Sequence, residues 1–279
     1  MCRSLWLLLG LMLCAFSGQA QEMYRAVFAG GRTYAMEETR FSMITHGEPV
    51  AANAEVELVG NSLLVLMDEG GRLVSFSGAG RYDLSKLNMT QLSDSSTFVY
   101  QVWETFYKAL PVPDDPPKAE SGREAFELMI PSSSQVLGDE VFLCWPDMDE
   151  AGYELRLINE FGEVFHRQKV AEAELKLNLL RKDLLWKQEV TLQVVGASTR
   201  YLSPLYTLDR LAPPDYEHFQ NLLKNELTGE DFAVLLTKSA FFENQWLFAD
   251  AITTINELRE SYGAVVDGFW QYYLERKGQ

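Results

Sequence analysis

The sequence has little cysteine. It contains three cysteines in 279 residues, and two of them, Cys2 and Cys14, lie in the apolar N-terminal segment. Cys144 is then alone, so an internal disulfide framework is excluded. Cys144 lies in the apolar run VFLCWP beside Trp145. We therefore predict a buried core thiol, with Trp145 filling the core next to it.

The motifs that mark common enzymes are also missing. A catalytic cysteine needs a histidine partner, but the three histidines are scattered without motif spacing. The glycine-rich stretch GAGRYD has no third glycine, and neither a Gly-Lys-Ser/Thr loop, a Gly-x-Ser-x-Gly elbow nor a His-Glu-x-x-His helix occurs. We interpret these glycines as turns between strands. An enzyme that uses a pair of its many carboxylates remains a minor alternative.

Positive charge is scarce. Without the N-terminal segment 1–20, which holds one arginine, the chain has 24 − 1 = 23 basic and 40 acidic side chains, a formal charge of −17. Such a chain is repelled by phosphate backbones and by anionic lipid. The charge therefore argues against binding of nucleic acid or of a membrane surface.

One acidic turn resembles a metal loop in part. The stretch PDMDEAG offers Asp147, Asp149 and Gly152 in the spacing of a calcium loop, but Ala151 replaces an oxygen ligand and Ile158 stands where the bidentate glutamate belongs. We favour a solvated acidic turn. No metal and no cofactor is predicted, and metal binding near Asp147 and Asp149 stays open.

The N-terminus reads as a secretory signal peptide. Arg3 precedes a short apolar run over residues 5–16, and small residues at Gly18 and Ala20 suit a cleavage site. Cys14 suggests lipoprotein processing as an alternative, but Leu13 precedes it where a small residue is needed. We predict cleavage after Ala20, a periplasmic or secreted protein, and no membrane insertion after cleavage.

The rest of the chain divides into regions of different periodicity. Residues 21–110 contain short strands with turns, followed by a helix over 93–110. Gly30-Gly31 indicates a hairpin, and Gly60-Asn61 indicates a second reversal of the chain. Residues 111–123 are rich in proline and acid and read as a linker between independently folded halves.

Two further regions follow the linker. Residues 124–210 hold about seven short strands, including a hairpin around Phe161-Gly162, and suit a two-sheet sandwich of the immunoglobulin or fibronectin type. Residues 211–279 have helical periodicity, with helices near 231–243, 246–260 and 264–276. The predicted fold class is therefore multidomain α+β.

Two regions resemble known families. Residues 24–84 resemble the FecR-type periplasmic domain in their strand and turn pattern, carried by Gly47-Glu48-Pro49-Val50, Gly60-Asn61-Ser62, residues 64–67 and Gly70-Gly71-Arg72-Leu73. Residues 232–276 resemble a tetratricopeptide helix pair, with Ser239 at the small position and Phe242 and Ala251 nine residues apart. About one and a half repeats fit. The resemblances imply a periplasmic β-module and a helical end used for binding.

We interpret the protein as an exported, non-enzymatic envelope protein, a protein–protein interaction scaffold or regulatory module with an envelope protein as partner. The alternative is a glycan-binding module of the envelope. At the C-terminal end, Phe269, Trp270 and Tyr273 are the candidate partner contacts. The competing interpretation places Phe269, Tyr272 and Tyr273 in a core seam.

Overall fold

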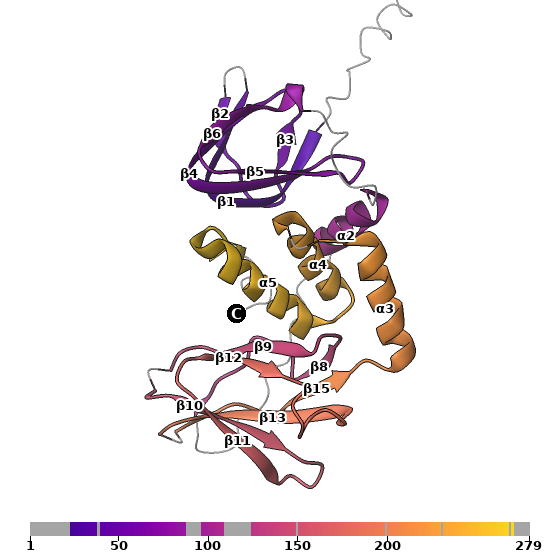
Figure 1. Cartoon of the computed structure of the whole chain (residues 1–279). Coiled ribbons are helices and arrows are strands. Elements are labelled where there is room, and N and C mark those ends of the chain that lie inside the picture. The colour runs from indigo at the N-terminus through magenta and orange to yellow at the C-terminus, as the bar shows by residue number, and fades with distance from the viewer. Residues whose placement is uncertain are drawn as a thin grey trace, which may run out of the picture. The chain divides into compact units, whose positions relative to one another are not determined.

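The computed structural model of the chain is a mixed α+β structure (Figure 1). It describes residues 23–37, 40–87, 96–108, 124–148, 150–198, 200–229, 231–267 and 269–270. The predicted signal peptide, linker and Tyr273 lie outside these residues. By its internal contacts the chain forms two compact units, Met1–Leu92 and Ser93–Gln279. None of the described helices combines the length and the apolar character needed to cross a membrane.

The first unit is built on two long antiparallel strands, β1 and β4. Both strands carry further strands at each end: β3 and β2 pair with β1, while β5 and β6 pair with β4. Apolar residues that alternate along these strands form one core, which includes Ala26, Val56, Leu64 and Phe76. The strands are β1 Met23–Glu37, β2 Arg40–Met43, β3 Pro49–Ala51, β4 Glu55–Met67, β5 Leu73–Ser77 and β6 Gly80–Asp83, with a 3₁₀ turn at Leu84–Lys86.

Strand β1 continues through Gly30-Gly31, and β4 continues through Gly60-Asn61. The hairpin predicted at the first position and the chain reversal predicted at the second are therefore wrong. The register between β1 and β4 shifts at Gly30/Arg32, where the strand bulges and continues. Gly31 has φ +79°, and a Cβ there would lie 2.6 Å from Ser62 Oγ, which accepts a hydrogen bond from Arg32 N. The glycines therefore allow two long strands to bend together.

The first helix, α2 (Ser96–Lys108), belongs to the second unit by its contacts. Trp103 Nε1 donates to Thr237 Oγ1 at 3.2 Å, and Asn244 Nδ2 donates to the Val102 carbonyl at 2.8 Å. The sequence analysis grouped this helix with the N-terminal strands, because periodicity reports a helix but not which surface it covers.

The second unit contains two sheets that form a β-sandwich (Figure 1). One sheet has the order β11-β10-β13, continued by β15 and β8, and the other pairs β12 with β9. Trp145 and Cys144 are buried, as predicted. The strands are β7 Glu124–Ala125, β8 Ser133–Val136, β9 Glu140–Cys144, β10 Tyr153–Ile158, β11 Val164–Val170, β12 Glu174–Asn178, β13 Glu189–Gly196, β14 Tyr201–Leu202 and β15 Tyr206–Arg210.

The predicted hairpin around Phe161-Gly162 is confirmed, because β10 and β11, which flank this turn, pair with each other in antiparallel orientation. Three helices follow the sandwich: α3 Pro213–Glu226, α4 Phe232–Asn244 and α5 Phe248–Tyr262, with a final 3₁₀ turn at Gly263–Val265. The predicted helices near 231–243 and 246–260 are therefore confirmed within two residues. Helix α4 packs against α2 and α5, and α5 packs against β8 and β9.

Candidate functional site

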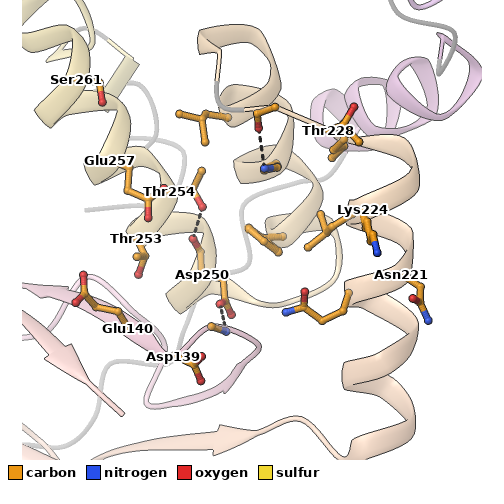
Figure 2. A pocket seen from close by; sticks show the side chains of 18 residues that line it. Asp139, Glu140, Asn221, Lys224, Thr228, Asp250, Thr253, Thr254, Glu257 and Ser261 are labelled. Atoms are coloured by element: carbon orange, nitrogen blue, oxygen red, sulfur yellow. Dashed lines mark hydrogen bonds between the residues drawn. The ribbon is translucent and has the colours of Figure 1, made fainter. Parts of the chain in front are cut away.

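One cavity of the second unit is an open cleft of about 1360 Å³ between α3 on one side and α4 and α5 on the other. Figure 2 shows Thr253, Thr254 and Glu257 along the α5 wall and Lys224 on the α3 wall. The turn between β8 and β9 closes one end. Three consecutive helices and one turn that is distant from them in the sequence therefore form this cleft.

The α3 wall is the least packed helix of the unit. None of its residues is buried, although Phe219, Leu222 and Leu223 are apolar and only partly covered. The helix begins at Pro213, whose fixed φ suits the first helical position, and no side chain caps it. Helical stability comes mostly from packing an apolar face, so α3 has little to hold it in place.

The α5 wall is fixed to the sandwich by buried polar contacts. Asp250 is 5% exposed, and its carboxylate accepts hydrogen bonds from Leu137 N at 2.9 Å and Gly138 N at 2.7 Å. Thr253 Oγ1 accepts from Phe142 N at 2.8 Å, at an edge of β9. These bonds satisfy backbone groups of the β8–β9 segment that the sheet leaves unpaired.

Burial changes the acid chemistry of this wall. Desolvation raises the pKa of Asp250 to about 6, although the two backbone N–H donors act in the opposite direction. Desolvation also raises the pKa of Glu257, which lies on the exposed side of α5. Asp250 is occupied by its backbone partners, so we assign it a structural role.

Charges of both signs line the cleft. Asp139, Glu140 and Glu257 line the sandwich and α5 side. Lys224 lies on α3, and Lys238 lies on α4, where its ammonium donates to the Gly229 carbonyl at 3.1 Å. Small-molecule sites usually measure about 300–1,000 Å³ and enclose their ligand. A larger, open cleft with both polar and apolar lining suits a polypeptide segment better.

The residues singled out from the sequence lie elsewhere. Phe269 is 1% and Trp270 8% exposed, whereas Tyr272 and Tyr273 lie outside the described residues. Their role as partner contacts stays a prediction. No group of three or more histidine, cysteine or acidic residues in the described part of the chain could hold a metal, and Asp149 is outside that part.

Sequence reasoning did not find the cleft. Asp250 and Gly138 are 112 residues apart, and no local motif joins them. The only available signal was an acid in the first turn of a helix, which usually indicates helix stabilisation.

Comparisons with known proteins give weak matches. No family model and no curated protein matches the chain. Among solved structures, the chain is similar to PorZ, described as an essential bacterial surface component of the type-IX secretion system of Porphyromonas gingivalis, with 12% identity over 65% of this chain and a TM-score of 0.25. It is also similar to a biofilm-associated protein BSP domain, with 10% identity over 71% of this chain and a TM-score of 0.20. A third similar structure is that of Dscam, with 9% identity over 66% of this chain and a TM-score of 0.19.

The chain spans 25%, 26% and 38% of the lengths of these three structures, respectively. At these TM-scores the likenesses carry no argument about function.

Proposed function

We propose that the protein is an exported, non-enzymatic interaction module of the cell envelope, and that the cleft between α3 and α5 binds an extended or helical segment of a partner protein. In this proposal the N-terminal strands are a FecR-like module, the sandwich is of the immunoglobulin or fibronectin type, and α4 with α5 is a tetratricopeptide-like pair. The signal peptide is cleaved after Ala20.

The observation that carries the proposal is the low burial of α3. A 14-residue helix without one buried residue leaves partly covered apolar side chains, among them Leu223, next to a wide open cleft. A partner segment that enters the cleft would cover this surface and add the packing that α3 lacks.

The helix pair supports the same proposal. Ser239, Phe242 and Ala251 are buried where α4 meets α5, at the positions that the tetratricopeptide pattern assigns to close helix packing. Arrays of this kind need about three repeats for stability, and here α5 rests on the β8–β9 edge of the sandwich instead. This arrangement leaves the α3 side of the pair available for a partner.

Site-resolved photocrosslinking tests the proposal. A benzophenone amino acid at Gln220, which lines the cleft, is compared with the same residue at His218, which is exposed on α3 but does not line the cleft. In cells that export the protein, we expect a discrete adduct from Gln220 and from Glu257 on the facing wall, and none from His218.

Mass spectrometry should place both adducts on one segment of the same partner. Equal labelling from all three positions, or labelling from His218 alone, would contradict a cleft-bound partner.

A further inference from the structure

A second cavity of the same unit, of about 450 Å³, has lining residues with unused hydrogen-bond donors. Trp145 is 3% exposed, and its Nε1 has no hydrogen-bond partner. The Nε of Arg259 is likewise buried and makes no hydrogen bond, since its ion-pair partner Asp267 Oδ1 lies 3.9 Å away. A buried N–H without an acceptor destabilises the fold, so native structures rarely leave two in one place without a use.

The charges of this cavity restrict what can bind. Asp147, Glu150, Glu172 and Glu174 line it, while Arg259 is the one cation among the described lining residues, which gives a formal charge of 1 − 4 = −3. An anionic ligand would be repelled. A simple cation has no acceptor atoms and would leave both N–H groups unsatisfied.

Acceptors for a ligand are also present. In the described part of the chain, the side chains of Glu172 and Glu174 have neither an ion pair nor a hydrogen bond. A matching ligand must therefore supply both acceptor and donor atoms, which hydroxyl groups do in one atom.

Aromatic rings provide the apolar part. Trp270 also lines the cavity, and the guanidinium of Arg259 lies over its ring at 5.2 Å from the centroid. The ring of Tyr153 meets Trp145 edge-on at 5.4 Å, and its hydroxyl is already bonded to Asp147. Tyrosine and tryptophan rings have apolar faces and one polar O–H or N–H group. They therefore suit ligands that have C–H faces as well as polar groups.

From these observations we propose that the cavity bounded by Trp145, Arg259, Glu174 and Trp270 binds a neutral or amine-bearing saccharide unit. Hydroxyl oxygens accept from Trp145 Nε1 and Arg259 Nε, and hydroxyl hydrogens are donated to Glu172 and Glu174. The site is separate from the α3 cleft and does not depend on its partner.

Titration calorimetry with three related sugars tests the charge argument. The full exported chain is titrated with N-acetylglucosamine, glucosamine and glucuronate, which share a ring but differ in charge. We expect N-acetylglucosamine and glucosamine to bind, with glucosamine tighter, and glucuronate to bind at least about tenfold more weakly. Absence of binding by both of the first two, or equal binding of glucuronate, would overturn the proposal.

Two variants test the donors. Trp145→Phe removes the N–H and keeps an aromatic ring, and Arg259→Lys keeps the charge but removes the Nε donor. Each should weaken N-acetylglucosamine binding about three- to tenfold, the typical value of one hydrogen bond. If Trp145→Phe does not fold, as judged by circular dichroism, Arg259→Lys still tests the site.

The matched control is Trp186→Ala, which removes a tryptophan that is 90% exposed on a turn of the same sandwich. Affinity should not change. Loss of binding in this control would assign the sugar to a surface aromatic instead. Binding of N-methylacetamide as tight as that of the sugars would assign the donors to a peptide carbonyl, and would also overturn the proposal.

Discussion

Helices α3 and α4 are neighbours of almost equal length, with 14 and 13 residues, but their environments are opposite. Helix α3 has no buried residue, whereas nine residues of α4 are buried, on all sides of the helix. A helix that is apolar all round needs partners on every side, while α3 keeps its polar residues in water. The comparison shows that α4 is part of the core of this unit, whereas α3 lies on its surface.

The largest expected loss of stability comes from removing one of the two phenylalanine rings that join these helices. Phe219 on α3 and Phe241 on α4 have ring centroids 6.0 Å apart, but Phe241 is only 3% exposed. Phe241→Ala should lower the free energy of unfolding by about 3–5 kcal/mol, because it leaves a cavity. Chemical denaturation measures the loss.

Phe219→Ala is the matched control and should cost about 1 kcal/mol or less, because this side chain is only partly buried. Equal losses in the two variants would show that α3 is packed as firmly as α4, and would remove the basis for a flexible cleft wall.

The next effect concerns the anchor that makes the α5 wall rigid in comparison with α3. Asp250→Ala leaves the N–H groups of Leu137 and Gly138 without their acceptor, and should cost about 2–4 kcal/mol near pH 4, where the stabilising contribution of Asp250 is present. Asp250→Asn keeps one carbonyl acceptor and should cost less. An alanine variant as stable as the asparagine variant would contradict the anchoring role.

The pH dependence of Asp250 has a definite sign. Its pKa in the folded state is about 6, above the unfolded value of 3.8, so its contribution to stability is fully present below about pH 3.8 and is lost as the pH rises through 6. Asp250→Asn should remove this part of the pH profile between pH 4 and 6. Denaturation curves of both proteins across that range provide the measurement.

The smallest effect concerns the turns that flank α4. The connection from α3 uses Gly229 at φ +112°, whereas the connection to α5 places Trp246 at φ +62°. A left-handed conformation costs a non-glycine residue about 1–2 kcal/mol. Trp246→Gly should therefore be about 1 kcal/mol more stable than Trp246→Ala, which loses the same ring but keeps the strain. The melting temperatures of the two variants measure this difference. A more stable alanine variant would show that the backbone at position 246 is not strained.

The sequence predicted the elements better than their contacts. Helices α4 and α5 were predicted because their apolar periodicity is regular and Gly263 ends the pattern. Gly30-Gly31 was misread because a glycine pair permits both a turn and a bulge, and only the pairing with β4 decides between them. The cleft could not be predicted, because Asp250 meets Gly138 through tertiary packing alone.

The bond between Thr253 and Phe142 has a consequence for the timing of folding. At the β9 edge of the sandwich, Phe142 N donates a hydrogen bond to the hydroxyl of a residue that is made 111 positions later. During synthesis, the strands emerge well before α5, and their edge stays unprotected until the C-terminal helix arrives. Long-range contacts of this kind slow folding and leave strand edges open to aggregation. A chain truncated before Phe248 should therefore aggregate although every strand of the sandwich is present.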